Sequence, residues 1–298
     1  MAADAPVFLT TKEVAALLRV KERKVYDLAA AGDIPFRRVT GRLLFPRTEI
    51  EAWLAAGSDP RLEAATAAVA SPRRPNIVVG SHDPLLEEYL RVSGSGLASL
   101  FDGSLDGLER IAAGEASACG LHLPGESGNA DAVSRRVEGD DFVLIEWAQR
   151  RQGLIYRADL ESGPGGVTDL AGLRVVDRQE KAGSRLLFDR LLAEAGLSRD
   201  AITFAGAPAR TESEAAQRIA AGKADAALGL EAMASAFGLG FTPLATERFD
   251  LLLERRAYFE PPFQALLTHM RSPEFAARAA ELGGYDVTSS GRVVWNGL

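Results

Sequence analysis

At 298 residues the chain is long for one domain, and its 47% hydrophobic and 25% charged residues are typical of a globular protein with real cores. The net charge is -7, and a single cysteine, Cys119, excludes an intramolecular disulfide framework and a cysteine metal cluster. The sequence opens without a signal-peptide pattern, and no apolar run approaches the ~18 residues of a membrane span. We therefore expect a cytoplasmic protein without a membrane segment, a metal or a cofactor.

The positive charges concentrate near the N-terminus. Between Arg19 and Arg47, eight Lys or Arg residues stand against three Asp or Glu residues, a local balance of +5 (eight minus three) in an acidic chain. A basic island of this kind is typical of a surface for a polyanion, although a solvated charged face gives the same pattern.

Residues 8–55 read as a small helical domain with a hairpin. Thr10 and Glu13 have the spacing of a capping box at the start of a first helix, and Gly32 is expected to end a second helix. Two short strands around Thr40 and Gly41 predict a hairpin before a third helix. The expected core residues are Val14, Leu17, Leu18, Val25, Leu28, Ala29, Ile50, Trp53 and Leu54.

Helix, turn, helix, hairpin and helix in about fifty residues is the order of a winged helix-turn-helix. The stretch resembles the excisionase-type, MerR-related domain through T-x-x-E-x-A-x-x-L-x-V, V-Y-x-L, G-x-I-P, R-x-x-G-R and E-I-x-x-W-L. The resemblance implies that the helix around residues 21–30 enters a major groove and that the Gly41-Arg42 wing reaches the backbone or the minor groove. The DNA-binding residues that it implies are Lys21, Arg23, Lys24, Tyr26, Arg37, Arg38 and Arg42.

An Ala-, Ser- and Pro-rich stretch follows this domain and indicates a linker. We place a DNA-binding domain at 1–57, a linker at 58–75 with a candidate short helix at 61–69, and a second domain at 76–298. A domain as small as the first makes few phosphate contacts, so useful affinity would call for a homodimer on paired half-sites of a double-stranded DNA operator.

The second domain alternates short apolar strands with helical patterns, which predicts an α/β architecture with largely parallel sheets. Three histidines, His82, His122 and His269, lie far apart, and no H-E-x-x-H, G-x-S-x-G or paired-carboxylate motif is present. Polar clusters instead follow apolar strands and lead into helices, as at residues 81–83 and 177–185. Such clusters place ligands at helix N-termini beyond the carboxyl ends of strands, so a binding cleft is favoured over an enzyme.

Eight motifs in chain order carry a second resemblance, covering residues 77–291. They are GSHDPLL, GSGLASLFDG, AAGEASACGLHLPG, RRQGLI, DRQEKAGSRLLFDRLL, ESEAAQRIAAGKADAALGLEA, GLGFTPLATERFDLLL and LGGYDVTSSG. This part resembles the cytoplasmic relative of type 2 periplasmic binding proteins, the PBP-like family linked to molybdate and tungstate sensing. The resemblance implies a bilobed α/β domain whose crossing segments lie near Arg151-Gln152-Gly153 and Thr242–Glu247.

The resemblance also implies a set of ligand-binding residues. These are Ser81, His82, Ser95, Gly96, His122, Arg151, Gln152, Arg178, Gln179, Lys181, Gly183, Ser184 and Arg185. The family pattern N-R-Q-x-G-S-G-T-R is altered here, with Lys181 and Ala182 in place of Gly and Ser. We expect this protein's ligand choice to differ from that of its relatives at these two positions.

The sequence is thus interpreted as a one-component transcriptional regulator that senses a small anion, a molybdate- or tungstate-type oxyanion, in its C-terminal cleft. A small organic carboxylate is the alternative ligand class. An enzyme on the bilobed fold and a recombination accessory protein, which the N-terminal resemblance suggests by itself, are the rival functions.

Overall fold

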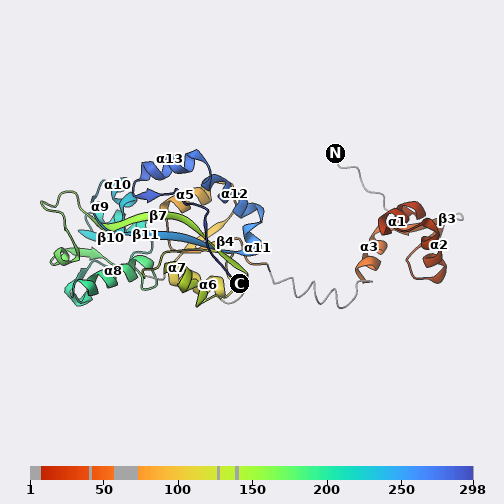
Figure 1. Cartoon of the computed structure of the whole chain (residues 1–298), viewed down its shortest axis with the longest axis horizontal. Coiled ribbons are helices and arrows are strands. Elements are labelled where there is room, and N and C mark those ends of the chain that lie inside the picture. The colour runs from red at the N-terminus through yellow and green to blue at the C-terminus, as the bar shows by residue number, and fades with distance from the viewer. Residues whose placement is uncertain (1–7, 40–41, 57–72, 126–127, 138–140, 298) are drawn as a thin grey trace. The chain divides into compact units, whose positions relative to one another are not determined.

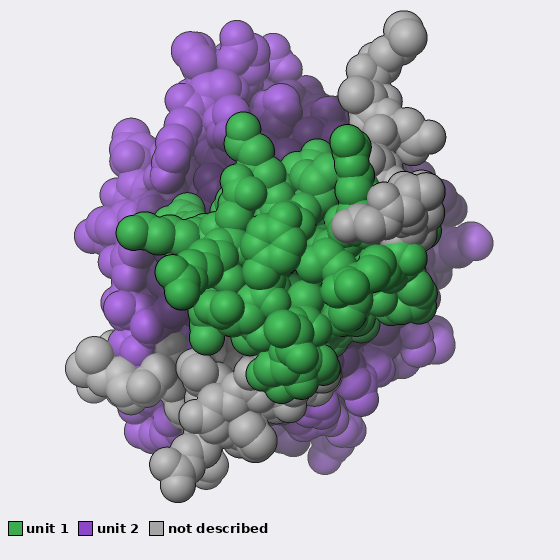
Figure 2. Space-filling view, turned by 90° about the vertical axis from the view of Figure 1, so that its right-hand side faces the viewer, with its two compact units in different colours: residues 1–73 green, residues 74–298 purple. Residues whose placement is uncertain are grey.

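The computed structural model describes residues 8–39, 42–56, 73–125, 128–137 and 141–297. The chain forms two compact units, residues 1–73 and 74–298, which are coloured separately in Figure 2. The candidate helix at 61–69 and the hairpin turn at Thr40 and Gly41 lie outside the described residues.

The described residues of the first unit form a three-stranded sheet and three helices. Its elements are β1 (Phe8–Thr10), α1 (Thr11–Leu18), α2 (Glu22–Ala31), β2 (Arg37–Val39), β3 (Arg42–Pro46) and α3 (Arg47–Ala56). The strand order is β1-β3-β2, and β2 pairs antiparallel with β3 as the predicted hairpin requires. Strand β1 was not predicted; it pairs with β3.

The local signals of the first unit act as expected. Thr10 caps α1, and Glu13 completes the reciprocal capping box. Gly32 ends α2 with φ at 76°, a conformation that glycine adopts without strain. Val14 and Val25 are fully buried, whereas Leu17, predicted to share their core, is 50% exposed. Leu17 was misplaced because the inward arc of α1 is formed by Thr11, Val14 and Ala15.

The second unit begins with three short strands and three helices that form one end of this unit. These are β4 (Ile77–Gly80), α5 (Pro84–Val92), β5 (Ala98–Phe101), α6 (Ser104–Ala112), β6 (Ala118–Leu121) and α7 (Gly128–Ser134). The chain then crosses to a second lobe in β7 (Phe142–Tyr156) and returns in β11 (Gly240–Glu254). Figure 1 shows β7 and β11 running side by side between the end with α8 and α9 and the end with α6 and α7.

The second lobe lies between the two crossing strands in sequence. It contains 3-10 helices at Val167–Leu170 and Arg199–Ala201, and β8 (Arg174–Val176), α8 (Gly183–Glu194), β9 (Thr203–Phe204), α9 (Glu212–Ala220), β10 (Ala226–Leu230) and α10 (Glu231–Phe237). After β11, the chain adds to the first lobe α11 (Arg255–Tyr258), α12 (Pro261–Met270), α13 (Pro273–Leu282), β12 (Tyr285–Asp286) and β13 (Val293–Asn296).

One sheet runs through both lobes, with strand order β5-β4-β6-β11-β7-β10-β8-β9 and with β12 and β13 paired to β7. The short strands β4, β5 and β6 pair parallel in the first lobe, and β8, β9 and β10 pair parallel in the second. Strands β7 and β11 are antiparallel to each other, β11 is antiparallel to β6, and β7 is antiparallel to β10, β12 and β13. Apolar clusters cover both faces of the sheet in each lobe. The predicted bilobed α/β architecture is confirmed, with a mixed sheet where a largely parallel one was expected.

The close packing of α6 on the sheet explains why this helix contains Gly107. A Cβ atom on Gly107 would lie 2.4 Å from the Cα of Gly80 and 2.6 Å from the sulfur of Cys119. Helix α6 therefore approaches β4 with no room for a side chain.

We predict that Gly107→Ala lowers the free energy of unfolding by about 2 kcal/mol, because the clash with strand backbone outweighs the better helix propensity of alanine. Differential scanning calorimetry should show a lower melting temperature for the unit of residues 74–298. Gly166→Ala is the control, because its Cβ would have no neighbour closer than 3.9 Å. If both substitutions lowered the melting temperature equally, the close approach of α6 to β4 would be contradicted.

Candidate functional site

Most of the predicted ligand-binding residues lie where the two lobes meet. Ser95 and Gly96 do not, because they precede β5 at the amino ends of the parallel strands β4 and β5. In the first lobe, residues 81–83 follow β4 and His122 follows β6, and both segments leave the carboxyl ends of parallel strands. In the second lobe, residues 177–182 join β8 to α8, which begins with Gly183 and Ser184. Strand ends and helix starts from both lobes thus face one region, as open α/β sheets arrange their ligand sites.

A buried chain of charges lies under this region. Asp83 caps α5 and also accepts hydrogen bonds from the Trp147 indole at 3.0 Å, the Arg150 guanidinium at 2.8 Å and the Tyr285 hydroxyl at 2.7 Å. Arg150 extends from β7, is 1% exposed and stacks 4.3 Å over the Phe249 ring. It therefore connects the first lobe to both crossing strands.

Glu247 of β11 continues this chain toward the cleft. One of its oxygens accepts hydrogen bonds from Arg150 and from the Gln152 amide at 2.9 Å, and the other lies 2.7 Å from Nδ1 of His122. Burial acts to raise the pKa of Glu247, but the charges and hydrogen bonds of His122 and Arg150 outweigh burial and lower the pKa to about 2. Glu247 is thus a carboxylate that holds the imidazole of His122 in place.

The lobes touch at the N-terminus of α8. A Cβ atom on Gly183 would lie 2.0 Å from the carbonyl oxygen of His122 and 2.7 Å from its ring, so only glycine permits this contact. Beside it, the backbone N–H of Leu105 donates to the carbonyl of Lys181 at 3.1 Å. The helix has Ala182 at its N-cap and no side-chain cap, so its first N–H groups are not capped from within the helix.

Two ion pairs bridge the lobes at the rim. Lys181 pairs with Glu109 of α6, and Arg210 pairs with Asp102 at 3.2 Å. Both pairs are largely exposed, so each contributes at most ~1 kcal/mol and weakens with salt. Lys181, the unusual residue of the turn, thus contacts the opposite lobe.

The predicted arginines of the second lobe are held by carboxylates. Arg178 is 5% exposed, pairs with Glu212, and donates to the carbonyls of Ala209 and Arg210. Arg185 pairs with both Asp177 and Asp189. Arg178 thereby fastens the turn after β8 to the start of α9.

Of the remaining predicted residues, Ser81, His82 and Ser95 are buried, whereas Gly96 and Arg151 are exposed. Ser81 and Ser104 share a 2.7 Å hydrogen bond. His82 lies edge-on to Phe101 and pairs through Nε2 with Glu87 at 3.0 Å. Gly96 lies in the left-handed region with φ at 68°, Ser95 hydrogen-bonds the backbone of Leu90 and Leu97, Arg151 pairs with Glu231, and Gln179 donates to the carbonyl of Arg210.

Several buried polar atoms in this region have no hydrogen-bond partner. Among the described residues they include Nδ1 of His82, Oε1 of Gln152, Oε1 of Gln179, Oγ of Ser184 and Oε2 of Glu212. Ser184 also lines a small void beside Arg178 and Phe188 whose free volume, about 10 Å³, is near that of one water molecule. Buried atoms left unpaired in a native fold call for an explanation.

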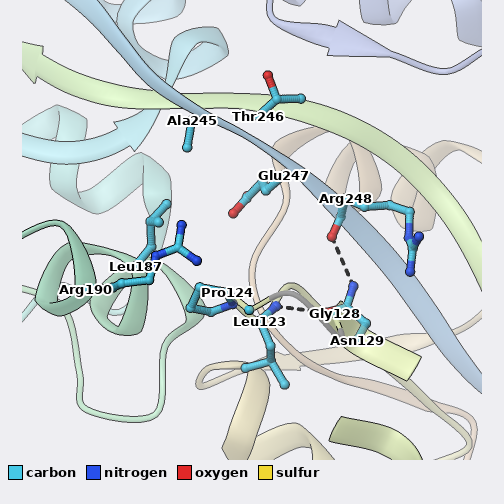
Figure 3. Close-up of a pocket in the computed structure, with 11 residues that line it drawn as sticks. Leu123, Pro124, Gly128, Asn129, Leu187, Arg190, Ala245, Thr246, Glu247 and Arg248 are labelled. Atoms are coloured by element: carbon cyan, nitrogen blue, oxygen red, sulfur yellow. Dashed lines mark hydrogen bonds between the residues drawn. The ribbon is translucent and has the colours of Figure 1, made fainter. Parts of the chain in front are cut away.

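A larger cavity of about 320 Å³ lies on the β11 side of the interlobe region. Figure 3 shows Glu247 projecting between Leu187 and Arg190 of α8 on one side and Leu123 and Pro124 of the first lobe on the other. Asn129 fixes the first-lobe wall, because its side chain accepts from the N–H of Leu123 and donates to the carbonyl of Arg248 (Figure 3).

None of the thirteen residues predicted to bind the ligand lines this cavity. Glu247, which does line the cavity, hydrogen-bonds two of the predicted residues, His122 and Gln152. Arg190, Thr246 and Glu247, which line the cavity, were not predicted as site residues. Glu247 lies in the expected return segment, but a single acid in a strand gives no signal of its side-chain partners.

The first unit carries the predicted DNA-binding face. All seven residues expected there, Lys21, Arg23, Lys24, Tyr26, Arg37, Arg38 and Arg42, are exposed. Lys21 is the N-cap of α2, and Arg23, Lys24 and Tyr26 follow in its first turns. Arg37 and Arg38 lie on β2 and Arg42 opens β3, so the helix and the hairpin strands each contribute positive charge.

Across the described part of the chain, no three His, Cys, Asp or Glu side chains form a group that could hold a metal ion. No helix within the same residues is long and apolar enough to cross a bilayer.

Comparisons with known proteins match both units. The family described as PBP superfamily domain matches residues 87–271, and the family described as Helix-turn-helix domain matches residues 8–58. The uncharacterized protein YvgK of Bacillus subtilis (strain 168) is 27% identical over 304 residues, which cover 96% of this chain and 97% of YvgK. An uncharacterized protein in the ferredoxin 2Fe-2S gene 5′ region of Clostridium pasteurianum is 34% identical over 80 residues, 26% of this chain and 71% of that protein.

One solved structure extends the comparison to the fold. A phosphate ABC transporter substrate-binding protein from Clostridium perfringens, solved with bound phosphate, has a TM-score of 0.51 at 10% sequence identity. The match covers 69% of this chain and 96% of that chain. At this identity it shows the fold of the second unit alone.

We predict that Glu247→Gln destabilises the protein by about 3 kcal/mol at neutral pH, because the lowered pKa of Glu247 represents stability that the neutral amide lacks. The sign follows from the lowered pKa: the contribution is present above pH ~4.5 and is lost as the pH falls toward 2. Denaturant unfolding at several pH values should show that the difference in free energy of unfolding between the parent and the variant becomes smaller in acid. A difference that does not change with pH would contradict the stabilising role of the Glu247 carboxylate.

Asp250 on the same strand gives the opposite prediction. Burial raises its pKa to about 6, and hydrogen bonds from Asn129 and Arg248 only partly offset that effect. The protonated form is therefore favoured by folding, and its contribution is lost as the pH rises through about 6. Asp250→Asn should gain about 2 kcal/mol relative to the parent between pH 4 and pH 7.5 in the same unfolding experiment. A constant difference between the two proteins would refute it.

Proposed function

We propose that this chain, which belongs to the PBP superfamily and carries an N-terminal helix-turn-helix domain, is a ligand-responsive transcriptional regulator. The observation that supports the proposal is that one chain contains both a DNA-binding type of unit and a ligand-binding type of domain. One is a winged-helix unit with seven exposed basic or aromatic side chains on α2 and the hairpin, and the other is a two-lobed domain whose lobes meet at a helix N-terminus.

In this proposal the first unit binds a double-stranded DNA operator. Helix α2 enters the major groove, with Arg23, Lys24 and Tyr26 toward base edges or phosphates, while Arg37, Arg38 and Arg42 contact the backbone. Few phosphates are within reach of so small a unit, so a homodimer on paired half-sites supplies the affinity. The protein then acts in the cytoplasm, where the operator lies.

The second unit binds a small anion between its lobes. A tetrahedral oxyanion of the molybdate or tungstate type would be received by the free N–H groups of α8, the Ser184 hydroxyl and a nearby arginine. A small organic carboxylate is the second candidate, and one observation favours it. The cavity beside Glu247 has about 320 Å³, which approaches the size of small-molecule pockets, and its lining combines apolar residues such as Leu123 and Leu187 with the cationic side chain of Arg190.

Ligand and operator binding are coupled by linkage. A ligand shifts DNA binding only as far as it prefers one arrangement of the two lobes, and a coupling of about 1–3 kcal/mol suffices for regulation. Catalysis is not part of the proposal. Both cleft histidines pair with glutamates, and no hydroxyl or thiol of the described residues hydrogen-bonds either imidazole.

The DNA-binding half predicts a salt effect. Replacing Arg42 or Lys24 by Ala should weaken binding to a labelled random-sequence duplex and lower the slope of log K against log salt by about one each. Fluorescence anisotropy over a salt series measures both quantities. Lys223→Ala, which removes the same charge from the second unit, should leave the slope unchanged. Binding that ignored all of these residues would contradict the proposed DNA face.

The ligand-binding half predicts a stability response. A specific ligand at ~100 times its dissociation constant should stabilise the second unit by ~2.7 kcal/mol. A thermal-shift series on the full chain with molybdate, tungstate, sulfate, phosphate and small carboxylates would measure it. A response to molybdate and tungstate alone supports the oxyanion, and a response to carboxylates alone rules it out.

A further inference from the structure

The two lobes meet so closely at the N-terminus of α8 that they cover it. A Cβ atom on Gly103 of the first lobe would lie 2.6 Å from the carbonyl oxygen of Lys181, just as Gly183 of the second lobe leaves no room beside His122. The void next to Ser184 has about 10 Å³, near the volume of one water molecule. In this closed arrangement an anion larger than water has no space at the helix terminus.

The contacts that hold the lobes closed come from the chain itself. The backbone N–H of Leu105 donates to the carbonyl of Lys181 at 3.1 Å, and the Lys181 ammonium pairs with Glu109 of α6. At the rim, Arg210 of the second lobe pairs with Asp102 of the first lobe at 3.2 Å. Closure by these contacts needs no bound anion to bridge the lobes.

Lys181 takes part in two of these contacts, through its backbone and through its ammonium group. The side chains of Lys181 and Glu109 are 47% and 59% exposed, so dissolved salt can screen their attraction. The Arg210 side chain is 71% exposed, and its pair with Asp102 is open to the same screening. The charged part of the interlobe contact is therefore sensitive to ionic strength.

The crossing strands contain an irregularity at which the lobes can separate. The register of β11 against β7 shifts between Pro243 and Ala245, opposite Gly153 and Gln152. Proline has no N–H to donate to the ladder, and a register shift of this kind interrupts pairing and bends a strand. Gln152 is also in register with Leu230, the last residue of β10, so the interruption lies where the second-lobe sheet ends.

We propose that the lobes close on each other without a ligand, that the Lys181–Glu109 pair is the latch, and that a ligand reaches the N-terminus of α8 only when the latch opens. The inference rests on the proposed ligand-binding function and describes how access to that site is regulated. Closing and binding then compete, so the apparent dissociation constant of a ligand equals its intrinsic constant divided by the open fraction.

The first test measures the distance between the lobes in the full chain with no ligand added. Ala112→Cys on α6 and Ala193→Cys on α8 put spin labels at exposed positions of the two lobes, and the native Cys119 is buried. Pulsed electron double resonance should show one short distance at about 20 mM salt. At about 500 mM salt a second, longer distance should appear, because screening weakens the interlobe ion pairs.

Charge reversal identifies the latch. Lys181→Glu and Glu109→Lys each bring like charges together, so each should raise the ratio of open to closed molecules about fivefold or more at low salt. The double variant restores an ion pair of reversed polarity and should return to the short distance. Lys223→Glu makes the same charge change before β10, at the opposite end of the second-lobe strands, and should leave the distance unchanged.

The second test measures access to the covered helix terminus. Ser184→Cys puts a thiol where the parent side chain is buried. Iodoacetamide, an uncharged reagent, should alkylate this thiol slowly at low salt and about fivefold faster at high salt or together with Glu109→Lys, because only open molecules react. Each rate is divided by that of Ala193→Cys, an exposed position of the same helix, to remove the effect of salt on the reagent.

The outcomes separate this inference from the proposed function. A ligand-free parent that shows only the long distance at low salt, or a Ser184→Cys thiol that reacts as fast as Ala193→Cys, would overturn closure without a ligand and leave the ligand-responsive regulator intact. An unchanged distance in Lys181→Glu, or a double variant that stays open, would show that this pair is not the latch. A latched parent that no molybdate, tungstate or carboxylate stabilises would support the latch and overturn the proposed ligand binding.

Discussion

The buried chain from Asp83 through Arg150 and Glu247 to His122 is the interaction on which the second unit depends. Asp83 belongs to the first lobe, Arg150 to one crossing strand and Glu247 to the other, so three segments distant in sequence are fixed to one another. Arg150 keeps its charge because Asp83 and Glu247 together outweigh burial, which would otherwise disfavour it. Removing any one partner leaves a buried charge uncompensated, which typically costs 3–5 kcal/mol.

The same principle of local pairing governs the site above this chain. Arg178, Arg185 and Lys181, the cations that an anion sensor would be expected to present, all contact carboxylates in this structure. What remains for a ligand is therefore polar and uncharged for the most part: helix N–H groups, a serine hydroxyl and side-chain oxygens. Recognition at such a site depends on the match between donors and acceptors more than on net charge.

Features encoded by neighbouring residues could be predicted from the sequence. The capping box of Thr10 and Glu13, the left-handed end of α2 at Gly32 and the hairpin pairing of β2 with β3 all follow from contacts within a few residues. Longer-range features were predicted less well. The continuous strand from Phe142 to Tyr156 is one of them, because its two halves belong to different lobes and connect them without a turn.

By itself, the sequence determined the winged-helix unit, the two-lobed α/β architecture and the segments that meet between the lobes, because periodicity, capping residues and ordered motifs are local properties. Only the tertiary structure decided which charges are already paired, that Lys181 reaches Glu109 of the other lobe, and that Glu247 joins His122 to a cavity on β11. Those facts depend on distances between residues up to 125 positions apart in the chain, such as His122 and Glu247, and residue spacing carries no information about them.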